Sequence, residues 1–311
     1  MYAEYFGLSE LPFSIAPDPR YLFLSAHHQE ALAHLAYGAR EANGFIQLTG
    51  EIGTGKTTLV RRLLSQMPEG VEIAFIFNPD VSRLGLLKSI LAELGEVVAP
   101  GAVERSDLAQ AIYRHLLAAH ARGRRVVLVI DEAQRLAPEV LEEVRLLTNF
   151  ETDRHKLLNV ILVGQPELRD TLARGDLRQL AQRVTARYHL GPLNREETDA
   201  YIRHRLRLAG APGPIFSQGA VRGIHRYTRG VPRLINLVCD RALMAAYAHG
   251  LREVSSRMVG MAVRELAGMP AARAGHALRR VVYMGGVFLA LVLATAIFAW
   301  WVAGHHGALP H

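Results

Sequence analysis

The stretch "GEIGTGKTT", residues 50–58, decides the fold because it constrains both the backbone and the ligand. Gly50, Gly55, Lys56 and Thr57 satisfy the pattern G-x-x-x-x-G-K-[S/T] of a loop that holds phosphate groups. Its glycines let backbone N–H groups turn inward toward phosphate oxygens, while the lysine reaches the β- and γ-phosphates and the threonine hydroxyl binds Mg²⁺. The predicted nucleotide-binding residues of this phosphate loop are Gly50, Glu51, Ile52, Gly53, Thr54, Gly55, Lys56, Thr57 and Thr58.

The sequence around this loop predicts a parallel sheet. An apolar strand runs into Gly50 and a helix is expected over residues 55–67, which is the context that a phosphate loop requires. Five apolar runs predict strands over residues 44–50, 71–77, 124–131, 157–164 and 186–190. Helical stretches separate the strands, and we expect Ser106 to cap the helix over 106–121. Continuous apolar strands that alternate with helices indicate an α/β fold with a five-stranded parallel sheet covered on both faces.

The pattern changes after residue 193, where strands cease and four helices are expected. These helices span residues 195–209, 217–228, 231–248 and 255–267. We therefore predict five parts: an α/β core with an N-terminal segment over 1–193, a helical lid over 194–268, a basic linker over 269–280, a membrane helix over 281–303 and a short tail over 304–311.

A pair of carboxylates follows the third predicted strand. The run "VVLVIDEAQ", residues 126–134, is an apolar strand that ends in Asp131 and Glu132. Asp131 suits a direct or indirect role at Mg²⁺ beside the phosphate loop. Glu132 suits the base that orients or deprotonates an attacking water. Neighbouring side chains at a strand end diverge, so one carboxylate can face the metal while the other faces the water.

Four more polar residues are candidates for the same chemistry. Gln165, after the fourth strand, could hold the water or the γ-phosphate, or be a turn residue before Pro166. Arg183 is the preferred arginine for presentation to a neighbouring subunit's nucleotide, with Arg187 as the alternative. Arg233, in "RGVPRLIN", could reach the γ-phosphate on domain closure or form an interdomain salt bridge.

Composition narrows the class of partner and the compartment. The formal net charge of +7 and the sequence pI of about 9.8 suit an anionic partner such as nucleotide, nucleic acid or lipid headgroups. Cys239 is the only cysteine in the chain, which excludes an intrachain disulfide and fits a reducing compartment. The first residues show no signal-peptide pattern, so we expect the N-terminal part to stay in the cytoplasm.

The run 281–303 is uncharged and 23 residues long, which is enough for a helix to cross a bilayer core of ~30 Å. Arg273, Arg279 and Arg280 precede it, and Trp300 and Trp301 lie near its distal end. These features predict a single span in the cytoplasmic membrane with the N-terminal part of the chain inside, rather than a buried core helix. The three histidines of the 304–311 tail are expected to be solvated rather than to bind a metal.

Taken together, these motifs resemble the AAA+ ATPases, and more narrowly the ExeA/GspA family of general-secretion-pathway ATPases with the related ATPases of pilus and exopolysaccharide/exosortase loci. The resemblance rests on the N-terminal FGL…PF…PDP run, "GEIGTGKTT", "VIDEAQ", "ILVGQPEL", "LAQRV" and "GVPRLIN", and covers residues 1 to about 267. It implies a five-stranded core with a helical lid, Mg-ATP hydrolysis, and oligomers in which Arg183 acts across the interface. It also implies that Pro17–Pro19 lie near the adenine. Longer relatives continue into a periplasmic peptidoglycan-binding domain, which we do not expect here, so we expect the short forms to be the better match.

Three functions remain open from the sequence. The first is a membrane-anchored ATPase that drives or regulates assembly of a secretion, pilus or exopolysaccharide export machine. Its expected partners are ATP, Mg²⁺, further copies of the chain, membrane lipid and inner-membrane assembly proteins. The second is a DNA-handling ATPase similar to transposition helpers, although no helix-turn-helix is recognisable and DNA is not the expected partner. The third is a nucleotide-gated scaffold that rarely hydrolyses ATP.

Overall fold

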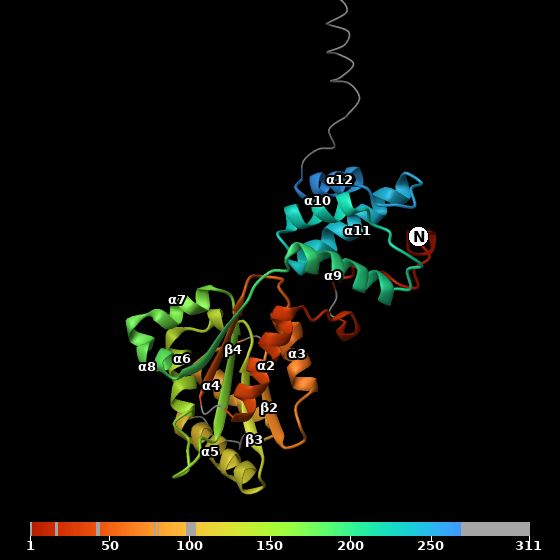
Figure 1. The fold of residues 1–311 in the computed structure, drawn as a ribbon. Helices are drawn as coiled ribbons and strands as arrows, with labels where there is room; N and C mark the ends of the chain where they lie inside the picture. Colours follow the sequence, from red (N-terminus) through yellow and green to blue (C-terminus); the bar gives the residue numbers. More distant parts are fainter. Residues whose placement is uncertain are drawn as a thin grey trace, which may run out of the picture. The chain divides into compact units, whose positions relative to one another are not determined.

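The computed structural model describes residues 2–15, 18–41, 44–77, 79, 81–97 and 104–268 of the chain (Figure 1). The predicted linker, membrane helix and tail lie outside these residues, as does Pro17. No helix within the described part of the chain has the length and apolar character needed to cross a membrane.

Five parallel strands form a single sheet in the order β2-β3-β4-β1-β5. The strands are β1 (Phe45–Gly50), β2 (Val71–Ile76), β3 (Arg125–Ile130), β4 (Leu158–Gly164) and β5 (Val184–Leu190). Because all five run in the same direction, their carboxyl ends meet at one edge of the sheet, and β1 brings the phosphate loop there between β4 and β5. The predicted α/β class and the five-stranded parallel sheet are confirmed.

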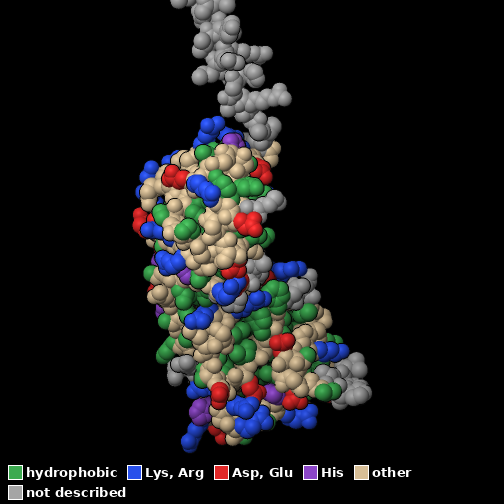
Figure 2. Space-filling model, turned by 90° about the vertical axis from the view of Figure 1, so that its right-hand side faces the viewer, with side chains coloured by type: hydrophobic (Ala, Val, Ile, Leu, Met, Phe, Trp, Pro, Cys, Tyr) green, Lys and Arg blue, Asp and Glu red, His purple; other side chains and the backbone are tan. Residues whose placement is uncertain are grey.

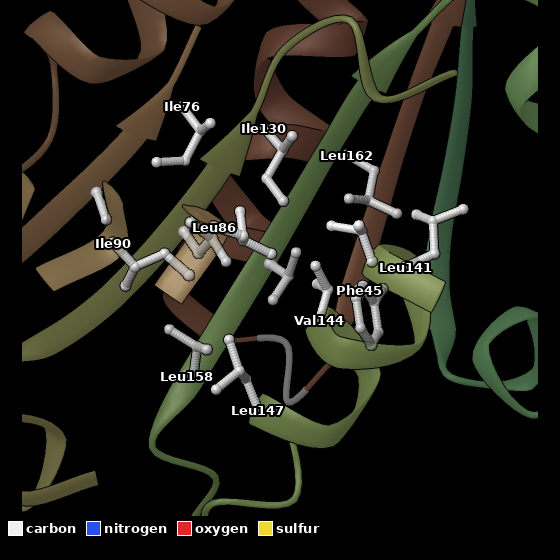
Figure 3. Close-up of a cluster of buried hydrophobic side chains, with 14 of the residues drawn as sticks. Phe45, Ile76, Leu86, Ile90, Ile130, Leu141, Val144, Leu147, Leu158 and Leu162 are labelled. Carbon is white, nitrogen blue, oxygen red and sulfur yellow. The ribbon is translucent and has the colours of Figure 1, made fainter. Parts of the chain in front are cut away.

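Helices cover both faces of the sheet, because the central strands are buried on both sides. On one face lie α4 (Arg83–Glu93), α5 (Arg105–Ala121), α6 (Pro138–Leu147), α7 (Glu167–Ala173) and α8 (Arg178–Gln182). On the other lie α2 (Ala26–Glu41) and α3 (Lys56–Ser65). Figure 3 shows Val144 beside Phe45 and Leu147 beside Leu158, with Leu86 near Ile130. Each fully buried side chain of this kind stabilises the fold by roughly 1.5–3 kcal/mol, so this core fixes the strand ends that carry the site.

The helical lid consists of α9 (Arg195–Leu208), α10 (Gln218–Thr228), α11 (Pro232–Ala248) and α12 (Ser256–Leu266), which Figure 1 shows grouped together. Asn194 begins α9 with a capping box, in which its side chain accepts from the Glu197 N–H and the Glu197 carboxylate accepts from the Asn194 N–H. Gly230 has a φ of 79°, and a Cβ there would lie 1.8 Å from the Leu193 carbonyl oxygen. Only glycine fits this position, where the turn before α11 crosses the end of the core.

The N-terminal segment packs against the lid, which the sequence did not predict. It contains α1 (Tyr2–Tyr5), and the turn η1 (Pro19–Tyr21) follows it. The Tyr2 hydroxyl donates a hydrogen bond to Asp240 of α11, and the Phe13 ring lies edge-on to Phe216 with centroids 5.9 Å apart. The boundary that we predicted at residue 193 stays a prediction, but residues 2–15 contact the lid far along the chain.

Most predicted elements agree with the structure to within two residues. One predicted helix cap differs: α5 begins at Arg105, Glu104 occupies its N-cap position, and Ser106 lies inside the first turn. The Ser106 hydroxyl donates to the Glu104 carboxylate at 3.4 Å and does not cap the helix, so that prediction is wrong. The short elements α1, α7, α8 and the turn η2 (Ala133–Arg135) were also missed. Each is too short to show a helical period in the sequence.

Candidate functional site

The phosphate loop closes around the ammonium group of Lys56. Gly53 and Gly55 adopt φ values of 82° and 100°, which favour glycine, and α3 begins directly after them. Lys56 Nζ donates to the carbonyl oxygens of Gly50 at 2.7 Å and Glu51 at 3.0 Å. Burial lowers the pKa of Lys56, while the nearby carboxylates of Glu132 and Asp131 oppose that shift. The loop thus holds a buried cation at the positive end of a helix, which is an arrangement that attracts phosphate.

Asp131 and Thr57 are joined behind the loop. Thr57 Oγ1 donates to Asp131 Oδ2 at 2.6 Å, and the backbone N–H of Glu132 donates to Asp131 Oδ1 at 2.9 Å. Burial raises the pKa of Asp131, and the hydrogen bond from Thr57 partly offsets that rise. A hydroxyl and a carboxylate with adjacent oxygens beside a phosphate loop are the donors that Mg²⁺ prefers, so these residues fit the predicted metal.

Glu132 is held in place by two glutamines. Its φ of 54° is in the left-handed region, which is uncommon for a residue with a side chain. Gln134 Nε2 donates to Glu132 Oε2 at 2.6 Å, and Gln165 Nε2 donates to the same oxygen at 3.3 Å. Gln134 Oε1 also accepts from the Gln165 backbone N–H at 3.0 Å. The ends of β3 and β4 therefore fix the carboxylate through one small polar network.

A cavity of about 590 Å³ joins these groups. Its walls come from the phosphate loop, the strand ends, the N-terminal segment and the lid. Of the residues predicted from the sequence, those that line it are Ile52, Gly53, Thr54, Gly55, Lys56, Thr57, Thr58, Glu132, Gln165 and Arg233. Gly50, Glu51 and Asp131 are not among the residues that line it.

The structure places the three predicted arginines differently. Arg233 lies at the start of α11 and lines the cavity, and its backbone N–H donates to Gly53 O at 3.3 Å. Arg183 lies outside the cavity and donates from Nη1 to Thr148 Oγ1 at 2.9 Å. Arg187, on the edge strand β5, donates to Ala181 O at 2.7 Å. Neither Arg183 nor Arg187 belongs to the cavity of its own chain, and a role in a neighbouring subunit stays a prediction.

Sequence reasoning missed several residues of the site. His28 of α2 is buried against the phosphate loop, with Nε2 3.3 Å from Thr54 O and Nδ1 2.8 Å from Ser25 Oγ. Because a carbonyl oxygen only accepts, Nε2 carries the proton and Nδ1 accepts from the Ser25 hydroxyl. Burial lowers the pKa of His28, which favours this neutral form. No motif marks His28, whereas Gln134 stands in the "DEAQ" run and could have been found there.

Asp131→Asn should separate stability from activity. A raised pKa in the folded state means that folding disfavours the ionised carboxylate, so the charged form costs stability above the ordinary pKa of an aspartate. An amide keeps one oxygen, which can accept from the Glu132 N–H, while its NH2 group can donate to the Thr57 hydroxyl, and it removes the charge. We expect an unchanged or higher melting temperature near pH 7, together with a loss of metal-dependent turnover. Thermal unfolding and phosphate release from one preparation check both, and a lower melting temperature would contradict this account.

The fold and the site define a class of protein. Residues 39–172 match the family described as AAA domain, and the chain has the fold of an AAA+ P-loop ATPase. Over 269 residues it is 51% identical to General secretion pathway protein A of Aeromonas hydrophila, and the match covers 86% of this chain and 49% of that protein. The chain thus spans about half the length of this curated relative. The resemblance to the ExeA/GspA-type ATPases is confirmed.

Solved structures show the same fold at low sequence identity. The Aeropyrum pernix ORC2 protein, in ADPNP–ADP complexes, superimposes with a TM-score of 0.61 at 18% identity, covering 83% of this chain and 72% of that chain. Cdc6p from Pyrobaculum aerophilum gives a TM-score of 0.63 at 19% identity, covering 82% and 70% of the two chains. At these identities the likeness establishes the fold alone.

Proposed function

We propose that this chain binds and hydrolyses Mg-ATP, and that it uses the cycle to drive or regulate assembly of a secretion, pilus or exopolysaccharide export machine at the cytoplasmic membrane. The observation that carries the proposal is the convergence of Lys56, Thr57, Glu132, Gln165 and Arg233 on one cavity. They come from the phosphate loop, two strand ends and the lid, which are far apart in the sequence. Each supplies a group that phosphoryl transfer to water requires.

The roles follow from position and chemistry. Lys56 and the loop N–H groups neutralise the phosphate charge, and Thr57 with Asp131 would hold Mg²⁺, which neutralises further charge on the phosphate oxygens when bound. Glu132 accepts a proton from the attacking water, while the Gln165 amide orients that water or the γ-phosphate. Arg233 brings a further positive charge to the cavity from the lid. The joint presence of these groups favours hydrolysis over a scaffold that only binds nucleotide.

The link to secretion comes from the relative's name, and the membrane location comes from the run 281–303. The charge of the lid also supports a location at the membrane. Residues 194–268 contain twelve arginines, no lysine and six carboxylates, whereas residues 1–193 contain 21 basic and 23 acidic residues. Figure 2 shows basic groups recurring over one face of the lid, with acidic groups among them. Arg222 and Arg226 are exposed on one face of α10. A basic lid that is followed by an apolar run suits the surface of an anionic membrane.

Fractionation of cells tests the membrane anchor. We expect the full chain to stay in the membrane fraction after an alkaline carbonate wash. Leu291→Arg with Leu293→Arg should move it to the soluble fraction, because each charge at mid-bilayer costs about 2.5–3.5 kcal/mol. Leu291→Ile with Leu293→Ile is the matched control. A charged variant that stays with the membrane would contradict the anchor.

DNA binding that weakens steeply with salt and stimulates hydrolysis would instead support the DNA-handling alternative.

A further inference from the structure

The N-terminal segment, residues 2–15, is bound to the lid at several points along its length. In addition to Tyr2 and Phe13, the Ser9 hydroxyl donates to Ala209 O at 3.0 Å and the Ser9 N–H donates to the same oxygen at 2.8 Å. The Tyr5 ring lies 5.3 Å from that of Tyr247 between centroids. The segment therefore adds a layer to the lid, although it is the first part of the chain.

The strongest of these contacts is made by Arg205 of α9, which is 5% exposed. Its Nε donates to Pro12 O at 2.6 Å and its Nη2 donates to Ser14 O at 3.2 Å. Its Nη1 donates to the Tyr201 hydroxyl at 2.9 Å, and its guanidinium carbon lies 4.6 Å from the centroid of the Tyr21 ring. Within the described residues no carboxylate forms an ion pair with it. The planar guanidinium group therefore binds two backbone carbonyl oxygens of the N-terminal segment at the same time.

The contact between Arg205 and the N-terminal segment lies in the wall of the nucleotide cavity. Arg205 and Tyr201 line the cavity, and so do Ser14, which Arg205 contacts, and residues that follow it along the chain: Ile15, Asp18, Tyr21, Leu22 and Phe23. This part of the wall is largely apolar and aromatic, which suits a planar base, whereas the phosphate loop supplies the polar part. The wall that would contact the base is therefore covalently continuous with a segment that is fixed to the lid.

We propose that Arg205 is a positioning residue, which makes residues 2–15 part of the lid so that the position of the lid sets the base-side wall of the nucleotide cavity. This inference rests on the proposed ATP binding. The lid then contacts the nucleotide site twice: through Arg233 at the phosphate loop, and through Arg205 and the N-terminal segment at the base. A lid that moves changes both ends of the cavity together.

Binding of two ligands to the full chain separates this role from a general effect on the site. We expect Arg205→Lys and Arg205→Met to weaken ATP binding by about tenfold or more. Neither a lysine ammonium group nor a methionine side chain can replace a planar guanidinium group that donates to two carbonyl oxygens. Inorganic tripolyphosphate, which has no base, should bind these variants as it binds the wild type. Arg203→Lys, at an exposed residue paired with Asp199, is the matched control.

Other results of these binding measurements would contradict either the role of Arg205 or the proposed function. Equal losses for ATP and tripolyphosphate, or no loss for either, would overturn the role of Arg205. Failure of the wild type to bind either ligand would count against the proposed function itself.

A disulfide provides a second test that leaves Arg205 unchanged. A Cβ at Gly210 would lie 3.8 Å from the Ser9 Cβ, which is the usual spacing of a disulfide. Gly210 has a φ of 81°, so a cysteine there is strained. The native Cys239 is buried, which protects it from disulfide exchange with the new cysteines. We expect Ser9→Cys with Gly210→Cys to form the bridge and to hydrolyse ATP at the same rate whether oxidised or reduced. Turnover that requires reduction of the bridge would overturn the proposal, because the segment would then have to leave the lid.

Discussion

Lys56→Ala is expected to abolish detectable ATP binding at micromolar nucleotide. The ammonium group is held inside the phosphate loop by the carbonyl oxygens of Gly50 and Glu51, where it is 6% exposed as a residue. A charge pair at about 4 Å in a partly screened site contributes about 4 kcal/mol. Loss of most of that interaction raises the dissociation constant by at least about 100-fold. Titration of a fluorescent ATP analogue measures the change directly.

The stability of the Lys56 variant shows whether the loss is local. Because burial lowers the pKa of Lys56, folding disfavours its charged form, and removal of that charge does not reduce stability. The melting temperature should be unchanged or higher near pH 7. Lys88→Ala, at an exposed position on α4, is the control for loss of a lysine elsewhere. Wild-type affinity in Lys56→Ala would contradict the assignment of the phosphate loop.

Glu132→Gln should keep ATP binding and lose turnover. The amide has the shape of the carboxylate and can still accept a hydrogen bond from Gln134, but it cannot take a proton from water. General-base catalysis contributes about 10²–10⁴-fold, so we expect a fall in the turnover number within that range and a dissociation constant within about threefold of the wild type. Single-turnover phosphate release with the protein in excess measures the chemical step. Turnover within a factor of a few of the wild type would assign the base elsewhere.

The sequence alone predicted the site residues wherever a short run of residues restricts its own backbone conformation. The loop 50–58 fixes a strand, a glycine turn and a helix within a few residues, and Asp131 and Glu132 follow an apolar strand that can only be central. The same reasoning placed Gln165 and Arg233 in the cavity. In these cases local backbone chemistry and the parallel sheet together determine where the side chains meet.

The residues that were missed depend on contacts between distant parts of the chain. Arg205 bonds to Pro12 and Ser14 across more than 190 positions, and His28 contacts Thr54 across 26. In the sequence, Arg205 is one of many arginines on a polar helix, and nothing marks it as buried. Tyr21 and Phe23 read as ordinary apolar residues until the lid and the phosphate loop are brought around them.

The most direct test of the central claim is phosphate release from ATP by the purified full chain in lipid, with Mg²⁺ and with excess chelator, beside the Glu132→Gln variant. We predict steady release by the wild type with Mg²⁺, none above background with the chelator, and bound but unhydrolysed ATP on the variant. Release that is equally fast from Glu132→Gln, or that persists without the metal, would contradict the account.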